Sequence, residues 1–343
     1  MARSFRVGIT RDLLSPEGTS AYGDIGLDLL EQAPGIEWGF LPEWQPELTP
    51  EQVREYDALI VLTPRVTAAS LAGADRLLLL ARFGVGYDRI DVPACTEAGV
   101  ALTITPDGVR RPVAAAELLF ILALSYRLME KDRLTREGRW EEKRACMGQG
   151  LTGKVLGSVG LGNIGSELFR LARPLEMVHL AYDPYADPAR AAELGVRLVD
   201  LPVLLQESDF LCINCPLNSE TYHLIGAREL ALMKPTAYLI NTARGAIVDE
   251  AALIKALRQG RIRGAALDVF EQEPVDPNNP LLKMDNVIVT PHGIAWTDEC
   301  FRGNGRSACQ EVLRVARGEP PVHVVNREVL QRPRFLEKLQ RWR

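Results

Sequence analysis

The chain of 343 residues has little of what marks secreted, membrane or disulfide-rich proteins. Its six cysteines are scattered without the spacing of a disulfide framework, so we expect a reducing cytoplasm. The longest apolar run, Val113–Leu124, carries Glu117 and is too short to span a bilayer. The first residues, MARSFRVGITRD, contain no apolar signal core and lead straight into a strand pattern. These absences predict a cytoplasmic protein without a membrane segment.

An excess of one charge sign is also missing. The net charge is -5, from 40 basic and 45 acidic residues, which gives no electrostatic reason to expect nucleic acid or an anionic membrane as a partner. The C-terminal stretch RPRFLEKLQRWR is locally basic, and a solvated helix or tail is favoured there over a nucleic-acid patch. The composition, 47% apolar and 25% charged, is typical of a globular protein, and the length allows two domains.

The stretch 154–184 has the pattern of a strand, a glycine-rich turn, a helix and a second strand. The sequence GLGNIG (160–165) supplies G-x-G-x-x-G after a short apolar strand, and residues 166–173 have the apolar spacing of a helix. A second strand is predicted at 178–181, and Asp183 stands at its end. An ordinary glycine-rich turn is the alternative, but the flanking elements favour a dinucleotide site.

Each glycine of this motif is expected to have its own task. The first permits a tight turn, the second lets the backbone approach a pyrophosphate, and the third lets the helix pack on the strand. The phosphates would lie at the helix N-terminus, where free N–H groups favour an anion. A carboxylate at Asp183 suits the ribose hydroxyls of NAD and would repel the extra phosphate of NADP. We therefore predict NAD as cofactor, held by Gly160, Gly162 and Gly165 together with Asp183.

Apolar segments alternate with helical or turn segments along most of the chain. This alternation is typical of parallel sheets that are covered on both faces. The strands expected before a turn at Thr105–Gly108 lie at 5–10, 36–41, 58–62, 77–81 and 100–103. A second, nucleotide-binding set runs from Gly153 to about Pro291, with its later strands at 196–199, 210–215, 237–242, 264–269 and 287–290. We predict an α/β fold with two doubly wound parallel sheets.

A long helix is expected between these two sets, from Pro112 to Arg136. Proline suits the first position of a helix, and the first half of the segment is apolar on nearly every side. Either this chain or a second subunit has to cover such a helix, and we favour a homodimer. Before it, the glycines around Val85 and Gly86 follow a strand and would let backbone amides meet a carboxylate, unless they only turn the chain.

Several charged residues follow directly on strands of the nucleotide-binding set. Arg244, Asp268, Glu273 and His292 all fall at the carboxyl ends of predicted strands. Ligands of doubly wound sheets lie at those ends, so we expect these side chains to share one cleft with the glycine turn. Arg244 would bind a carboxylate with two parallel hydrogen bonds, and His292 would exchange a proton with an alcohol oxygen near neutral pH. A hydrogen bond to Glu273 would fix the tautomer of His292.

Each of these residues also has an ordinary structural interpretation. Arg244 alone would cap a loop, Glu273 would be a surface acid, and His292 would be a loop histidine with its hydrogen bonds satisfied. Together, behind a dinucleotide motif, the catalytic interpretation is ahead. The other histidines, His179, His223 and His323, lack comparable companions and are assigned no role. The two thiols of the C-x-x-C at 212–215 should face opposite sides of a strand, so no metal site is predicted.

The motifs GLGNIG with Asp183, INTARGAIVDEAAL (240–253), ALDVFEQEP (266–274) and VTPHGIAW (289–296) resemble the D-isomer-specific 2-hydroxyacid dehydrogenases over nearly the whole chain. The resemblance implies that Arg244 binds the carboxylate and keto oxygen of a substrate and that Glu273 and His292 form the acid/base pair. It implies that Val85 and Gly86 lie near substrate and nicotinamide. The cofactor contacts it implies are Asn163, Ile164, Asp183, Cys215, Thr242, Ala243 and Asp268.

The same resemblance implies a domain arrangement. A flavodoxin-like substrate-binding domain would comprise 1–107 and 293–343, and a Rossmann-type NAD-binding domain, 108–292, would be inserted between them. The helix at 112–136 would then form a dimer. Departures from the family pattern at Arg110-Arg111, at Glu117 and after His292 touch the expected substrate pocket, so substrate identity is least determined.

The expected activity is hydride transfer between NAD and a small D-2-hydroxy or 2-keto acid. The chain length leaves no room for the regulatory domains of many phosphoglycerate dehydrogenases, so a hydroxypyruvate or glyoxylate reductase is favoured. A formate dehydrogenase is an alternative that Glu273 argues against. A non-catalytic NAD-sensing corepressor is another, and the intact set of Arg244, Glu273 and His292 argues against it.

Overall fold

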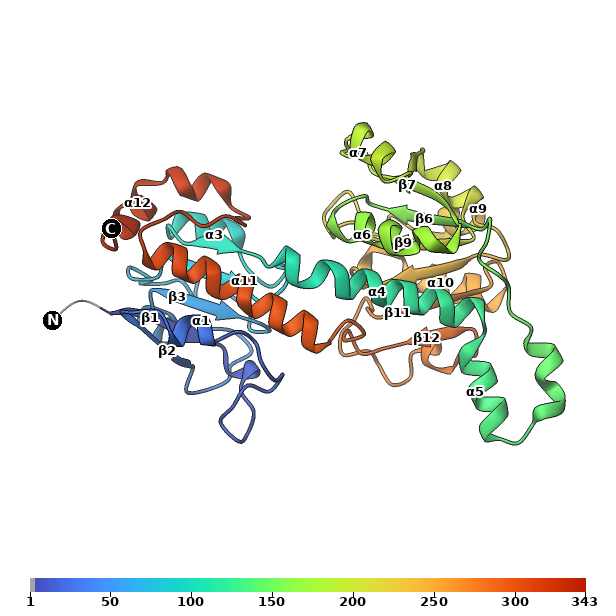
Figure 1. The fold of residues 1–343 in the computed structure, drawn as a ribbon, viewed down its shortest axis with the longest axis horizontal. Coiled ribbons are helices and arrows are strands. Elements are labelled where there is room, and N and C mark those ends of the chain that lie inside the picture. The colour runs from blue at the N-terminus through green and yellow to red at the C-terminus, as the bar shows by residue number, and fades with distance from the viewer. Residues whose placement is uncertain (1–3) are drawn as a thin grey trace. The chain divides into compact units, whose positions relative to one another are not determined.

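The computed structural model describes residues 4–343, which form two compact units (Figure 1). The first unit comprises the chain up to residue 109 together with residues 296–343, and the second comprises residues 110–295. Each unit contains one parallel sheet, of five and seven strands, so the predicted pair of doubly wound α/β sheets is confirmed. The roles predicted for the two parts of the chain stay predictions.

The first unit is built on a sheet in the order β2-β1-β3-β4-β5, with every pairing parallel. All four residues of β3 are buried, as expected for a central strand covered on both faces. The strands are β1 Phe5–Ile9, β2 Ile36–Phe40, β3 Ala58–Val61, β4 Leu79–Arg82 and β5 Ala101–Thr103. The helices wholly within this unit are α1 Asp28–Glu31, α2 Pro50–Arg54, α3 Val92–Glu97, α11 Asp298–Ala316 and α12 Pro333–Gln340.

The second unit has a parallel sheet in the order β12-β11-β10-β9-β6-β7-β8. The strands are β6 Val155–Val159, β7 Val178–Tyr182, β8 Arg197–Leu198, β9 Phe210–Ile213, β10 Tyr238–Asn241, β11 Gly264–Leu267 and β12 Val287–Val289. The helices wholly within this unit are α5 Leu128–Arg136, α6 Asn163–Ala172, α7 Pro188–Glu193, α8 Leu201–Glu207, α9 Ala227–Leu232 and α10 Glu250–Arg258. Short 3-10 turns occur at 11–13, 140–146, 173–175, 245–247, 280–283 and 327–331.

Alternate residues of the central strands enter two different cores of the second unit. Leu211 and Ile213 of β9 pack in one buried cluster, while Phe210 and Cys212 of the same strand pack in another. Successive side chains of a strand point to opposite faces, so both faces of this sheet are covered by apolar side chains. The chain crosses from one side of the sheet order to the other between β6 and β9. In a sheet of this kind ligands bind beside that crossing.

The predicted single helix at 112–136 is wrong. Helix α4 spans Pro106–Ser125 and α5 spans Leu128–Arg136, with a bend of 59° between them. Arg127 has a left-handed φ of 51°, and its guanidinium donates to the carbonyl of Ala145 at 2.5 Å. The segment contains neither glycine nor proline at the break, so the local pattern is continuous. The break coincides with the left-handed backbone of Arg127, whose side chain bonds to the 3-10 turn at 140–146.

The beginning of α4 also differs from the prediction. The turn expected at Thr105–Gly108 is instead the first turn of the helix, and Pro106 holds the first helical position that was assigned to Pro112. Pro112 lies inside the helix, where it cannot donate a hydrogen bond to the carbonyl of Gly108. Among residues 4–343, no helix is by itself both long and apolar enough to cross a membrane; α4 and α5 taken together meet that measure by length and composition only.

The basic C-terminal stretch is only partly solvated. Helix α12 buries Phe335 and Leu339, and the Lys338 side chain is only 3% exposed. The Lys338 ammonium donates hydrogen bonds of 2.8–3.0 Å to the carbonyls of Ala74, Leu77 and Ala98. A lysine that looked like surface in the sequence thus ties the C-terminal helix to backbone around α3 and β4 of the same unit, and burial lowers the pKa of this lysine to about 7.

Candidate active site

The glycine turn after β6 has the shape that a pyrophosphate requires. Gly160 has a φ of +102°, and a Cβ there would meet the Asn214 carbonyl oxygen at 2.6 Å, so only glycine fits. A Cβ on Gly162 would meet nothing within 4 Å, which leaves space over this backbone. A Cβ on Gly165 would meet the Gly160 carbonyl oxygen at 2.5 Å, so this glycine lets α6 pack on the turn. The residues therefore fit a dinucleotide, while the contacts themselves stay predictions.

Asp183 is held beside this turn at the end of β7. Its Oδ2 accepts a hydrogen bond from the Leu161 N–H at 2.8 Å, and its Oδ1 accepts one from the Tyr185 N–H at 2.9 Å. The carboxylate is thus fixed next to the expected phosphate site before any ribose is bound. Arg190 of α7 donates to the Ser166 hydroxyl of α6 at 3.4 Å, so its guanidinium lies against the helix that follows the glycine turn.

The loop that carries Arg244 follows β10 and lies against the loop that follows β11. Asn241 shapes it by donating to the Arg244 carbonyl at 2.9 Å and accepting from the Ala243 N–H at 3.0 Å. A Cβ on Gly245 would meet the Phe270 carbonyl carbon at 1.9 Å, so only glycine allows these two loops to touch. The Arg244 guanidinium donates to the Ala243 carbonyl at 2.6 Å.

Glu273 and His292 form a hydrogen-bonded pair at the ends of neighbouring strands. The distance from His292 Nδ1 to Glu273 Oε2 is 2.7 Å, and Glu273 Oε1 accepts the Phe270 N–H at 3.1 Å. Burial alone would raise the pKa of the Glu273 carboxyl, but His292, the Phe270 amide and the Arg244 charge together lower that pKa below its ordinary value. The three side chains predicted to act together are therefore close enough to affect one another.

His292 has a left-handed φ of 50°, a strained conformation for a residue other than glycine. Asp268, which is only 5% exposed, holds the surrounding loop in place. Its Oδ1 accepts hydrogen bonds from the Thr290 hydroxyl at 2.6 Å, the Gly293 N–H at 2.9 Å and the Ile294 N–H at 3.1 Å. The sequence predicted Asp268 only as a cofactor contact and missed this positioning role. The available signal for this role was that Asp268 and His292 follow successive predicted strands. Those strands, β11 and β12, pair side by side in the structure.

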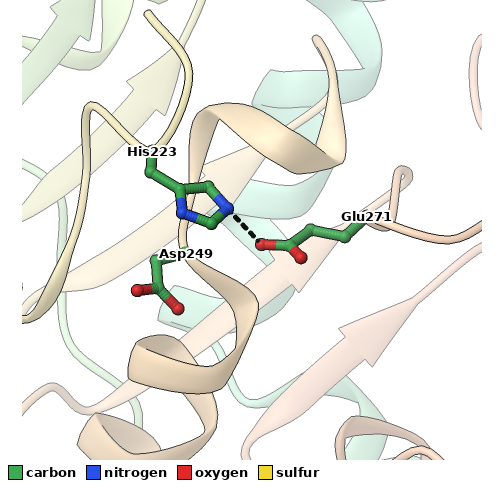
Figure 2. Close-up of side chains that lie close together, drawn as sticks. All are labelled: His223, Asp249 and Glu271. Atoms are coloured by element: carbon green, nitrogen blue, oxygen red, sulfur yellow. Dashed lines mark hydrogen bonds and ion pairs between the residues drawn. The ribbon is translucent and has the colours of Figure 1, made fainter.

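Two further histidines have carboxylate partners, so the expectation that they lack companions is wrong. His323 lies 2.8 Å from Glu311, and His223 Nε2 lies 2.8 Å from Glu271 Oε1. Figure 2 shows the His223 ring pointing at Glu271, with the Asp249 side chain below the ring; Asp249 directly precedes α10. Donor atoms of His223, Glu271 and Asp249 lie within 4.8 Å of one another.

Those two carboxylates already accept backbone hydrogen bonds. Asp249 caps α10 by accepting the Ala252 N–H at 2.9 Å, and Glu271 accepts the Glu250 N–H at 2.9 Å. The cluster therefore has a structural explanation as a junction between two loops and the start of a helix. We assign no metal to it.

The remaining predicted residues lie as follows. Val85 and Gly86 belong to the first unit, where Arg82 donates to the Gly86 carbonyl at 2.7 Å. Cys215 lies beyond the end of β9 rather than on the strand, and it is a free thiol like the other five cysteines. Arg111 of the unusual arginine pair bonds to Glu167 of α6 at 3.0 Å. The substrate contacts predicted for Val85 and Gly86 stay predictions.

A seven-stranded parallel sheet with a glycine turn at its crossing, and with a hydrogen-bonded glutamate and histidine at its strand ends, is the arrangement of a nucleotide-binding α/β fold. The chain matches the family model of the D-isomer specific 2-hydroxyacid dehydrogenase, NAD binding domain, over residues 118–293. It is 40% identical over 313 residues to a glyoxylate reductase of Thermococcus litoralis, covering 89% of this chain and 94% of that protein. The match to a D-3-phosphoglycerate dehydrogenase of Archaeoglobus fulgidus is 40% identical over 276 residues, which cover 80% of this chain and 52% of that protein.

A solved structure of D-lactate dehydrogenase from Escherichia coli has a TM-score of 0.78 and 27% sequence identity, covering 94% of this chain and all of that one. The chain belongs to the D-isomer-specific 2-hydroxyacid dehydrogenase family. It is an oxidoreductase whose coenzyme is NAD or NADP. The predicted enzyme class is thus confirmed, and the choice of NAD over NADP stays a prediction.

Proposed function

We propose that the protein reduces a small 2-keto acid to the D-2-hydroxy acid with NADH. The observation that carries the proposal is the 2.7 Å hydrogen bond between His292 and Glu273, which follow the neighbouring strands β12 and β11, with Arg244 following the next strand, β10. A guanidinium, a carboxylate and an imidazole are the groups needed to bind a 2-keto acid and to protonate its carbonyl oxygen.

In this mechanism Arg244 binds the substrate carboxylate and orients the neighbouring carbonyl. His292 Nδ1 is bonded to Glu273, which leaves Nε2 to donate a proton to the carbonyl oxygen. Glu273 stays ionised at neutral pH, because its pKa is lowered, and it stabilises the protonated imidazole before transfer. The coenzyme, when bound, supplies the hydride to the carbonyl carbon.

NAD is the coenzyme that the turn favours. The Asp183 carboxylate is fixed beside the glycine turn, where it would accept hydrogen bonds from ribose hydroxyls and repel a 2′-phosphate. Gly160, Gly162 and Gly165 would hold the pyrophosphate against the N-terminus of α6, with the amides of Asn163 and Ile164 facing it. Cys215, Thr242 and Ala243 would line the nicotinamide half. Asp268 would also contact the coenzyme, in addition to holding the loop that carries His292.

A homodimer is proposed from apolar surface of the second unit. Six large apolar side chains on or after α4 and α5 are exposed, and each of them leaves roughly half or more of its surface open to solvent: Leu119, Tyr126, Leu128, Met129, Trp140 and Met147. Monomers rarely expose so much apolar surface, so a second copy of the chain is the expected cover. Leu119→Glu should reduce the mass measured by light scattering to that of one chain; an unchanged mass would reject this interface.

The substrate is proposed to be glyoxylate or hydroxypyruvate. The relatives that match over most of both chains are named glyoxylate reductases, whereas the phosphoglycerate dehydrogenase is matched over only half its length. The six free thiols further support a reducing compartment such as the cytoplasm.

The deciding experiment is a panel of 2-keto acids, each assayed with NADH and with NADPH at 340 nm. We expect turnover with small 2-keto acids and a preference for NADH. His292→Gln should lower kcat by about 10²–10⁴-fold, the usual effect of a lost general acid. His223→Gln is the matched control, because it removes the histidine of the other pair beside the same strand ends, and it should leave turnover unchanged.

The two alternatives give different results in the same panel. A formate dehydrogenase would reduce NAD with formate and ignore keto acids. An NAD-sensing corepressor would bind NADH and turn over none of the acids, and His292→Gln would not change its binding. Either pattern would reject the proposed reductase.

A further inference from the structure

The second unit contains a buried carboxyl that the mechanism above does not use. This carboxyl connects three parts of the unit. Glu117 of α4 is completely buried, with an exposed fraction of 0%. Its Oε1 accepts a hydrogen bond from the Thr242 hydroxyl at 2.8 Å, and its Oε2 accepts one from the Asn214 amide at 3.2 Å. Thr242 follows β10 and Asn214 follows β9, so one side chain joins the ends of both strands.

The same network reaches the glycine turn. The Asn214 side-chain nitrogen also donates to the Ser158 hydroxyl at 3.1 Å, and Ser158 donates to the Gly160 carbonyl at 2.7 Å. Hydrogen bonds therefore connect the Glu117 carboxyl to the backbone at the expected pyrophosphate site and to Thr242.

The carboxyl of Glu117 is bonded by a hydroxyl and an amide, which carry no charge. The hydrogen-bond partners of Glu117 are neutral, and burial raises its pKa to about 7 although Thr242 and Asn214 act in the opposite direction. The titratable group that faces it from β9 is Cys212, whose pKa is raised well above the ordinary value by burial and by Glu117. That thiol stays neutral at physiological pH.

The position of Glu117 matters because of how a dinucleotide crosses such a sheet. If Asp183 holds the adenosine ribose after β7, the nicotinamide half would lie on the other side of the crossing, where β9 and β10 end. Those are the strand ends to which Glu117 is bonded. The nicotinamide ring carries a positive charge in NAD⁺ and none in NADH, so it attracts a nearby carboxylate in only one of its two states.

We propose that Glu117 is a positioning residue that links a proton to the charge of the nicotinamide, being ionised when NAD⁺ is bound and protonated when NADH is bound. The inference rests on the proposed function, because it needs the coenzyme to lie over β9 and β10. Binding of NAD⁺ then releases a proton from Glu117, and binding of NADH does not. The enzyme's preference between the two coenzyme forms becomes dependent on pH.

The test uses the full-length protein and titrates it with NAD⁺ and NADH at pH 6, 7 and 8. Histidines titrate in the same range, so the measurement is made in the His292→Gln background and compared with His292→Gln combined with Glu117→Gln. With Glu117 present, the ratio of the NAD⁺ to the NADH dissociation constant should fall by about threefold to tenfold between pH 6 and pH 8. With Glu117→Gln the ratio should be the same at each pH.

A second measurement needs no variant of Glu117. Calorimetric titration of His292→Gln at pH 7, in two buffers of different ionisation enthalpy, should show a fraction of a proton released with NAD⁺ and none released with NADH. Equal proton release would overturn the inference, as would a coenzyme ratio that does not change with pH while Glu117 is present. If the wild-type protein also reduces keto acids, the proposed function survives that result. If the wild type binds neither coenzyme, both proposals fail.

Discussion

The Asp268 carboxylate holds the Gly293 N–H at 2.9 Å, and this bond fixes the residue that follows His292. Because Asp268 also bonds the Ile294 N–H, Asp268→Ala should release the strained loop and lower kcat/KM at least about tenfold. The loss of buried hydrogen bonds should also lower the melting temperature. Asp268→Asn keeps one acceptor oxygen and should have a smaller effect on both. Equal turnover of wild type and Asp268→Ala would show that the loop holds its shape without this carboxylate.

Glu273 determines how the rate of reduction depends on pH. Its lowered pKa keeps it ionised through neutral pH, where it stabilises a protonated His292. Glu273→Gln removes that charge, so the variant should reduce more slowly at neutral pH, and the loss of rate that the wild type shows when acid protonates Glu273 should be absent. The profile of kcat/KM from pH 3 to 9 measures this, and two superimposable profiles would contradict the assigned role.

The lowered pKa of Glu273 also determines how the stability of the folded protein changes with pH. An acid whose folded pKa lies below its unfolded value adds stability above the unfolded pKa and loses it as the pH falls through the folded one. The wild type should therefore lose stability relative to Glu273→Gln when melting curves are compared at pH 5 and pH 3.

Asp183 is expected to select NAD. Asp183→Ala removes the hydrogen-bond acceptor for the ribose and should weaken NADH binding by about 1–3 kcal/mol, the scale for an unpaired polar group. Removing the negative charge should at the same time reduce the discrimination against NADPH. Dissociation constants for both coenzymes measure this. Asp187→Ala is the control, because Asp187 caps α7 a few residues later and does not bond to the glycine turn.

Glu117→Gln should change how stability depends on pH. The folded pKa of about 7 lies above the ordinary value of 4.5, so the contribution of Glu117 is full below the unfolded pKa and is lost as the pH rises through about 7. The amide variant has no proton to lose. It should gain stability over the wild type between pH 5 and pH 8, by up to about 3 kcal/mol. Urea denaturation at both pH values tests this, and a constant difference would show that the carboxyl does not titrate.

Lys338→Met should destabilise the first unit. The substitution leaves the carbonyls of Ala74, Leu77 and Ala98 without their buried donor, at a cost of about 1–3 kcal/mol. The midpoint of urea denaturation measures the loss. Lys143→Met, which alters an exposed lysine, should leave the midpoint nearly unchanged.

The sequence by itself determined the features that neighbouring residues control. The three glycines of 160–165, the strand that precedes them and the acid at 183 are specified within one short stretch, because glycine conformations and apolar spacing are local properties. The motifs around Arg244, Glu273 and His292 follow strands that the sequence also shows. The order of parallel strands then brings these three residues to one edge.

Only the tertiary structure decided which carboxylate each group meets. Glu117 and Thr242 are joined across 125 residues, and Asp268 bonds to the loop of His292, because the strand order and the course of α4 place them together. His223 and His292 both have glutamate partners, and no local pattern separates the two pairs. The left-handed backbone at Arg127 likewise has no signal in the residues around it. Backbone preferences act between neighbours in the chain, whereas burial and hydrogen-bond partners are set by packing.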